Sequence, residues 1–208
     1  MSFVFKKDEA AIAAATAGGS LDTGVHSVTI TGAYLVQDAS DNYRMDLELE
    51  SNTGAKASIY GLCVQEKWNT GKDNFDYPRF QELVAVTNPA FTGAVVDGKR
   101  KNFEGKENDA KILTELVGKS FMVAIQIELD YYNGKEKILR KLNRSFFADG
   151  TTTAEKAAGA PALTSEKLKT TLKDYSNKRH QAFLAGGSPT AGVASAADTT
   201  AQDDDIEL

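Results

Sequence analysis

The chain has little of the two residue types that build disulfide and zinc frameworks. It contains one cysteine, Cys63, and two histidines, His26 and His180. A single cysteine excludes an internal disulfide, and these three side chains cannot supply the four nitrogen and sulfur ligands of a structural zinc site. Zinc-finger and zinc-ribbon folds are therefore excluded, and no metal or other cofactor is expected. The lack of disulfides fits a reducing cytoplasm.

Long apolar runs and catalytic motifs are also missing. No apolar stretch approaches the roughly 18 residues of a membrane span, and residues 1–9 lack the order of a signal peptide because their lysines follow the apolar patch. Neither a glycine-rich phosphate loop nor a His-Glu-x-x-His pair occurs. Asp46, Glu48 and Glu50 are predicted to face solvent rather than to bind Mg²⁺. We expect a non-enzymatic protein without a membrane segment.

The negative charge is concentrated at one end of the chain. The formal net charge is −5, from 24 basic and 29 acidic residues. Beyond residue 180 there is no lysine or arginine, and the five acidic residues there are Asp198, Asp203, Asp204, Asp205 and Glu207. Residues 1–180 are therefore neutral, with 24 basic residues and 24 acidic ones (29 less these five). Residues 99–144 carry eleven basic against seven acidic residues, and this segregation is more informative than the total.

Alternating apolar and polar residues predict strands in the middle of the chain. The five predicted strands cover residues 25–36, 43–50, 55–64, 121–131 and 136–147. The expected apolar face of the first strand comprises Val28, Ile30, Gly32, Tyr34 and Val36. The last two strands are joined by Asn133-Gly134, the strongest hairpin signal in the chain.

A long insertion, from about residue 65 to 109, separates the third and fourth strands. A short helix is predicted near residues 79–86, and a helical turn at 111–117 ends at Gly118. Three antiparallel strands, a long connection and a two-stranded hairpin fit a mainly β fold. A five-stranded antiparallel barrel of OB type fits this layout better than a larger sandwich does.

The flanks are rich in Ala, Gly, Ser and Thr, which predicts four regions. They are an N-terminal arm (1–24, with an Ala-rich helix at 8–19), an OB-fold domain (25–147), a linker with a C-terminal helix (148–187, the helix at 165–184) and a disordered acidic tail (188–208). Leu168, Leu172 and Tyr175 form an apolar stripe on the C-terminal helix. We favour packing of this stripe on the barrel, with a homodimer contact or added phosphate contacts as alternatives.

Basic and aromatic side chains recur in the insertion and the last strands. A binder of single-stranded DNA needs cations along a groove for the phosphates and flat rings for the bases, each stacked base contributing about 1–3 kcal/mol. The predicted DNA-binding residues are Tyr60, Trp68, Lys72, Phe75, Tyr77, Arg79, Lys99, Arg100, Lys101, Tyr132, Lys137, Arg140, Lys141 and Arg144. Arg140 and Arg144 have the same parity along their strand and are expected on one surface.

A simpler interpretation competes for each of these residues. Basic residues interleaved along a strand commonly protect its edge and keep a protein soluble, and a tryptophan near a tyrosine is more often part of a core than a platform for bases. The OB-like layout, the basic last strand and the basic-aromatic insertion together raise the expectation of DNA binding.

The last six residues, Asp203-Asp204-Asp205-Ile206-Glu207-Leu208, place an acidic run before an apolar end. Such a tail can compete with DNA for the protein's own cationic groove or dock in a basic-rimmed pocket of a partner. Acidity alone more commonly serves solubility. The run Asp203 to Ile206 resembles the acidic tip of bacterial and phage single-stranded DNA-binding proteins, although that tip finishes in Pro-Phe and this chain in Glu207-Leu208.

The body is similar to phage-encoded OB-fold members of the same group at residues 25–35, Glu115 to Lys119 and Tyr132 to Lys135. The resemblance implies sequence-independent binding of single-stranded DNA in replication, recombination or repair, in the cytoplasm of a phage's host. It also implies that the tail recruits replication or recombination proteins. Two alternatives come from other classes: a structural or assembly protein of a phage particle, and an adaptor that acts through its tail without binding DNA.

Overall fold

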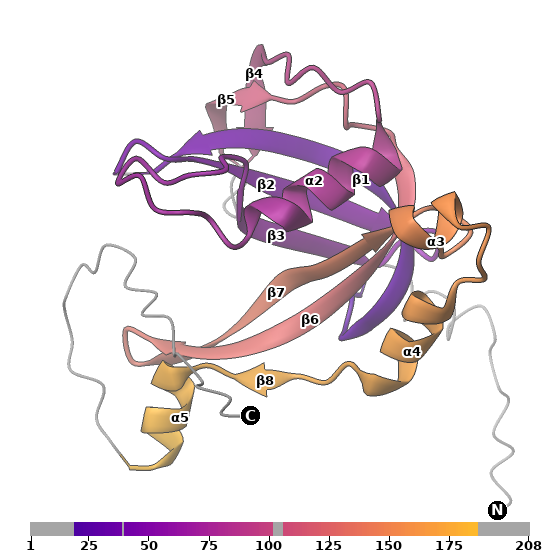
Figure 1. Cartoon of the computed structure of the whole chain (residues 1–208). Coiled ribbons are helices and arrows are strands. Elements are labelled where there is room, and N and C mark those ends of the chain that lie inside the picture. Colours follow the sequence, from indigo (N-terminus) through magenta and orange to yellow (C-terminus); the bar gives the residue numbers. More distant parts are fainter. Residues whose placement is uncertain (1–18, 39, 102–105, 187–208) are drawn as a thin grey trace, which may run out of the picture.

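One mixed sheet of eight strands dominates the part of the protein that the computed structural model describes, residues 19–38, 40–101 and 106–186. The order across the sheet is β4-β5-β1-β2-β3-β7-β6-β8 (Figure 1). The strands are β1 (Gly24–Gln37), β2 (Tyr43–Ser51), β3 (Lys56–Cys63), β4 (Val96–Lys101), β5 (Glu107–Ile112), β6 (Ser120–Tyr132), β7 (Lys135–Phe146) and β8 (Tyr175–Ser176). The helices are α2 (Tyr77–Thr87), α3 (Thr153–Ala157), α4 (Leu163–Thr171) and α5 (Lys178–Leu184).

The expected mainly β class is confirmed, but the expected set of five strands, all antiparallel, is wrong. The five predicted strands correspond to β1, β2, β3, β6 and β7. Three further strands join them, and two of the pairings, β3 with β7 and β6 with β8, are parallel. The additional strands pair largely through their backbones and carry little apolar sequence, which is why alternation did not predict them.

Strands β1, β2 and β3 form an antiparallel meander with its apolar residues on one face. Ile30, Leu47 and Ile59 are buried in the core on that face, as the period of two along a strand requires. Helix α2 covers the same core with Phe80 and Leu83, which are also buried. The predicted helix at 79–86 lies within α2 and is confirmed.

A bulge in β1 changes which side chains face the core. The register of β1 against β2 shifts between Ile30 and Gly32. Beyond the shift Ala33 is fully buried, whereas Tyr34 is half-buried and Val36 is exposed. The prediction that Tyr34 and Val36 share the face of Ile30 is therefore wrong, because one extra residue moves all that follow to the other face.

The long hairpin of β6 and β7 turns at Asn133 and Gly134, both with positive φ (53° and 75°), as the Asn-Gly signal predicted. Along its first half β1 pairs with β6, and β3 meets β7 in parallel at Ile59 and Arg140. Pairings therefore lead from β1 through β2, β3, β7 and β6 back to β1. Toward its turn the hairpin diverges from β3 (Figure 1).

Within the insertion, β4 and β5 form a second hairpin at the end of the sheet. It joins β1 through the register pairs Tyr34–Ile112 and Leu35–Lys111. Gly98 of β4 allows a close approach, since a Cβ atom there would lie 2.3 Å from the Ile112 side chain. The predicted helical turn at 111–117 is only partly right, because Lys111 and Ile112 belong to β5 and the turn occupies residues 114–118.

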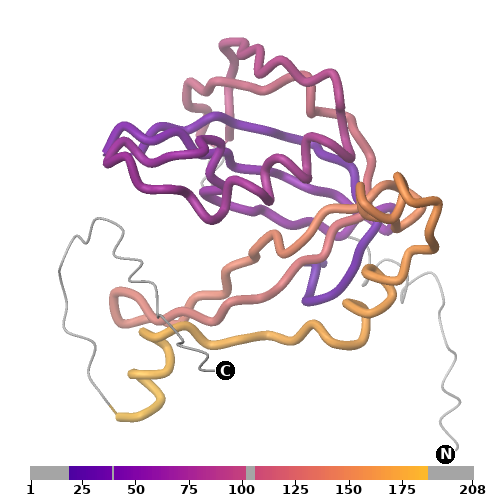
Figure 2. The backbone as a smooth tube through the Cα atoms, in the orientation of Figure 1, coloured from indigo at the N-terminus to yellow at the C-terminus, as the bar shows by residue number. Residues whose placement is uncertain are grey.

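The C-terminal strap, residues 153–184, runs alongside the β6–β7 hairpin (Figure 2). It contains α3, α4, β8 and α5, so the prediction of one helix over 165–184 is wrong, and the expected linker holds a short helix. The strap is fixed to β6 by Asp130, which accepts hydrogen bonds from Asn177 and Arg179, and by the stacked rings of Tyr131 and Phe183.

Two predicted segments lie outside the described residues: the Ala-rich helix at 8–19, apart from its last residue, and the acidic tail at 188–208. The end of the expected N-terminal arm is built into the fold, because Ser20 pairs with Lys56 and Leu21 is buried. Among the helices of the described ranges, none has the length and apolar character needed to cross a membrane.

Candidate functional site

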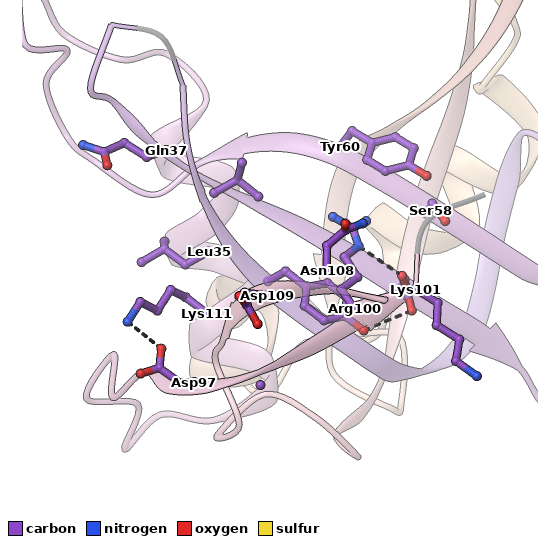
Figure 3. A pocket seen from close by; sticks show the side chains of 15 residues that line it. Leu35, Gln37, Ser58, Tyr60, Asp97, Arg100, Lys101, Asn108, Asp109 and Lys111 are labelled. Atoms are coloured by element: carbon purple, nitrogen blue, oxygen red, sulfur yellow. Dashed lines mark hydrogen bonds and ion pairs between the residues drawn. The ribbon is translucent and has the colours of Figure 1, made fainter. Parts of the chain in front are cut away.

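A large hollow lies between the β4–β5 hairpin and the outer face of β1, β2 and β3 (Figure 3). Its volume is about 1000 Å³. Tyr34, Ser58 and Tyr60 come from the meander, where they alternate with core residues, and Arg100 and Lys101 come from β4. The β4–β5 hairpin therefore forms one wall of the hollow, and the outer face of the meander forms its floor.

A second hollow of about 450 Å³ adjoins the first, because Ser58 and Tyr60 line both. It lies where β3 and β7 separate, and its charged lining residues are Lys56, Lys137 and Arg140, with no acidic side chain. The two hollows together are called the Tyr60 groove below. Tyr60 is 42% exposed at their junction, so its ring is accessible to a ligand that crosses from one hollow to the other.

Arg100 is the most tightly held cation of the groove. Its guanidinium lies 2.7 Å from Asp46 and 3.5 Å from Glu48, and its central carbon is 4.5 Å from the ring centre of Tyr34 and 5.7 Å from that of Tyr60. Burial opposes the charge, but the hydrogen bond to Asp46 and the attraction of both carboxylates outweigh it. The pKa of Arg100 is therefore raised.

Tyr34 lies beneath the same guanidinium. Burial is the main cause that raises the pKa of its phenol, and the neighbouring carboxylate of Glu48, which accepts a hydrogen bond from the phenol at 3.4 Å, acts in the same direction. The phenol of Tyr34 therefore stays neutral, and its ring lines the groove beneath Arg100.

Three lysines of the groove keep exposed side chains. Lys101 of β4 is exposed and lines the first hollow. Lys56 is 3.5 Å from Glu50 and remains exposed. The amine of Lys137 lies 4.6 Å from the ring centre of Tyr132, so this ring from the hairpin end is brought next to the groove. Exposed amines beside accessible rings can bind an anionic, ring-bearing polymer.

The structure brings some predicted residues together in this groove. The predicted residues that line it are Tyr60, Arg100, Lys101, Lys137 and Arg140, and Tyr132 lies next to it through its contact with Lys137. Arg140 serves the fold as well, because its Nε donates a hydrogen bond of 2.7 Å to the carbonyl oxygen of Leu21.

Other predicted cations are paired with acids of their own. Lys99 pairs with Asp109, Arg79 with Asp76, Lys141 with Glu128 and Arg144 with Glu82. The expectation that Arg140 and Arg144 share a surface is wrong, because the register of β6 and β7 shifts between Ala124 and Ile125. Arg144 instead reaches α2.

The predicted aromatic residues of the insertion do not line the Tyr60 groove. Trp68 is half-buried beneath the guanidinium of Arg44. Tyr77 packs against the core, with its ring 6.2 Å from that of Phe80. Phe75 is 79% exposed and lies in the 65–76 loop with Lys72, away from the groove lining. Trp68, Phe75 and Tyr77 therefore do not form one binding surface with Tyr60.

Sequence reasoning missed Tyr34 and Lys56 as lining residues. The signal for Tyr34 was Gly32, since a glycine inside a strand commonly marks a bulge. A Cβ atom on Gly32 would lie 2.7 Å from the Tyr34 ring, so the glycine makes room for that ring. Lys56 follows a turn and gave no signal of its own.

The sequence matches no protein-family model, and no curated protein matches it significantly. Function is therefore inferred from the geometry of the groove.

Proposed function

We propose that this chain binds single-stranded DNA without sequence preference, in the Tyr60 groove. The observation that carries the proposal is the position of Tyr60, an exposed ring at the meeting of two hollows whose lining includes the exposed lysines Lys56, Lys101 and Lys137. Phosphates of a strand crossing the groove would lie near these amines, and a base would stack on Tyr60. Because every base has a flat face and every phosphate one charge, this mode of binding does not depend on sequence.

We also propose that β1, β2, β3, β6 and β7 form a five-stranded barrel of OB type with additions. The pairings that lead from β1 through β2, β3, β7 and β6 back to β1, with β3 and β7 parallel, support this proposal. The β4–β5 hairpin, β8 and the strap are then additions to the barrel. OB barrels bind oligonucleotides on the face of their second and third strands, which here are β2 and β3.

We further propose that the protein serves replication, recombination or repair of a phage genome, with the residues 203–208 as the contact for partner proteins. The acidic run followed by an apolar end in the sequence supports this role. It is separate from the groove, and its failure would leave the DNA-binding proposal intact.

Fluorescence anisotropy with the full chain tests the proposal. A labelled oligo(dT) and a duplex of equal length are titrated at about 50 and about 200 mM NaCl. Three lysine–phosphate contacts correspond to a slope of log affinity against log salt near −2, so the fourfold rise in salt should weaken oligo(dT) binding roughly 20-fold. The duplex should bind more weakly, because its bases are stacked and paired. Failure to bind oligo(dT) at the lower salt, or preference for the duplex, would remove the proposal.

A further inference from the structure

Arg100 differs from the other cations of the β4–β5 hairpin in how far it is withdrawn from solvent. Its side chain is 22% exposed, whereas those of Lys99 and Lys111 are each 61% exposed. Its partner Asp46 is 14% exposed. An ion pair shielded in this way is held more firmly than a pair on the open surface, where salt and water weaken the attraction.

Among the described residues, the hairpin pairs with the meander at Tyr34–Ile112 and Leu35–Lys111 on β1, and Leu113, directly after β5, donates its backbone N–H to Ala33 at 2.9 Å. Strands β2 and β3, which form the floor of the groove, are reached through Arg100, by its contacts with Asp46, Glu48 and Tyr60. Arg100 therefore links the wall directly to the floor.

The carboxylate of Asp46 that pairs with Arg100 also contacts β3. Its Oδ1 accepts a hydrogen bond of 2.9 Å from the backbone N–H of Gly61, next to Tyr60, while its Oδ2 accepts from Arg100. Gly61 has φ 73°, in the left-handed region, and the carboxylate fixes the backbone at this irregular point of β3. One carboxylate thus holds both the wall and the strand that carries the ring.

We infer that Arg100 is a positioning residue and not a phosphate contact: through Asp46 it holds the β4–β5 hairpin over β2 and β3 as the wall of the Tyr60 groove. This inference rests on the proposed function. It replaces the expectation from the sequence that Arg100 binds DNA directly. Its neighbour Lys101, exposed on the same strand, is the phosphate contact of this hairpin.

The direction in which Asp46→Asn changes the affinity for oligo(dT) distinguishes the two roles of Arg100. Asp46→Asn removes a negative charge from a DNA-binding face, and the Asn carbonyl can still accept from the N–H of Gly61. If Arg100 binds phosphate, the variant frees its guanidinium, and oligo(dT) binding tightens. If Arg100 positions the hairpin, the variant releases the wall, and binding weakens by roughly fivefold to twentyfold. We expect weakening.

The salt dependence of binding gives an independent readout. Arg100→Ala should weaken binding by a similar factor at every salt concentration, with the slope of log affinity against log salt unchanged. Lys101→Ala, the matched control from the same strand, should reduce that slope by about 0.7, the loss of one contact on single-stranded DNA. Arg100→Lys keeps the charge but not the paired geometry, and it should behave like Arg100→Ala.

Hydrogen exchange on the free proteins keeps the test separate from DNA binding. Backbone amides of β5 should exchange faster in Arg100→Ala and Asp46→Asn than in the wild type. In Lys101→Ala their exchange rates should equal those of the wild type. If the wild type does not bind oligo(dT), the proposed function fails, and exchange alone decides whether Arg100 holds the hairpin. If the wild type binds, the proposed function stands, and three results would overturn the inference about Arg100. They are tighter oligo(dT) binding by Asp46→Asn, a reduced salt slope in Arg100→Ala, and unchanged hydrogen exchange of β5 in these two variants.

Discussion

The guanidinium of Arg44 lies over the ring of Trp68, with 4.9 Å between its central carbon and the ring centre. The same guanidinium pairs with Asp38 at 3.0 Å, and Asn69 donates its backbone N–H to the side chain of Asn42 at 2.8 Å. These contacts join the loop after β1 to the loop after β3. Trp68, which the sequence suggested as a platform for bases, therefore takes part in the contacts that pack these two loops together.

Replacing Arg44 should destabilise the fold without affecting the groove. Arg44→Ala removes the cation–π contact and the partly exposed ion pair, which together predict a loss of about 1–2 kcal/mol in the free energy of unfolding. Urea denaturation followed by the fluorescence of Trp68, the single tryptophan, measures the loss. Lys72→Ala, in the same loop, is the control and should change stability by less than about 0.5 kcal/mol. An equally stable Arg44→Ala would show that the stacking carries no energy.

Local alternation predicted the strands that bury side chains and missed those that do not. In β2, Tyr43, Met45, Leu47 and Leu49 alternate with charged residues, and the strand was predicted from its first residue. Strands β4 and β5, VDGKRK and ENDAKI, contain almost no apolar residues, and are held by backbone pairing and by ion pairs such as Lys99–Asp109. Such strands carry no periodic signal for burial.

A buried carboxylate, Asp130, is one of the groups that hold the C-terminal strap. Asp130 is buried and accepts hydrogen bonds from Asn177 at 2.8 Å and from Arg179 at 2.9 and 2.5 Å. These bonds outweigh the burial of the group, and the pKa of Asp130 is lowered. Asp130→Ala should lower the free energy of unfolding by about 1–3 kcal/mol, because the charged hydrogen bonds with Arg179 and the bond from Asn177 are lost.

Limited proteolysis checks where the effect of Asp130→Ala arises. Cleavage within residues 173–186 should be faster in this variant than in the wild type, whereas Lys178→Ala, on the exposed side of α5, should leave cleavage unchanged. Equal cleavage rates in all three proteins would mean that other contacts hold the strap.

The start of the strap should confer a pH dependence on stability. Hydrogen bonds from the backbone of Thr152 and from Thr164 lower the pKa of Glu155 to about 2, below its ordinary value of 4.5. Because the folded pKa is the lower one, the stabilisation is complete above about pH 4.5 and is lost as pH falls toward about 2. Glu155→Gln should therefore flatten the fall of stability across this range in thermal unfolding. Glu66→Gln, an exposed glutamate of another loop, should reproduce the wild-type slope; an unchanged slope in Glu155→Gln would contradict the account.

The candidate site was only partly accessible to sequence reasoning, for a physical reason. The sequence suggested Tyr60 and the run from Lys99 to Lys101 as DNA-binding residues. Which cation is free and which is paired depends on contacts between distant segments, such as Arg100 with Asp46, 54 positions apart. Bulges in β1 and between β6 and β7 also reversed the parity on which the placement of Tyr34 and Arg144 depended.

The most direct test compares two tyrosines of equal exposure. Tyr60 and Tyr43 are 42% and 41% exposed on neighbouring strands, but only Tyr60 lines the groove. In oligo(dT) titrations at low salt, Tyr60→Ala should weaken binding roughly 5- to 150-fold, the equivalent of losing one stacked base at about 1–3 kcal/mol, and Tyr43→Ala should stay within about twofold of the wild type. Equal effects of the two substitutions, or an unchanged affinity for Tyr60→Ala, would contradict the assignment of the groove.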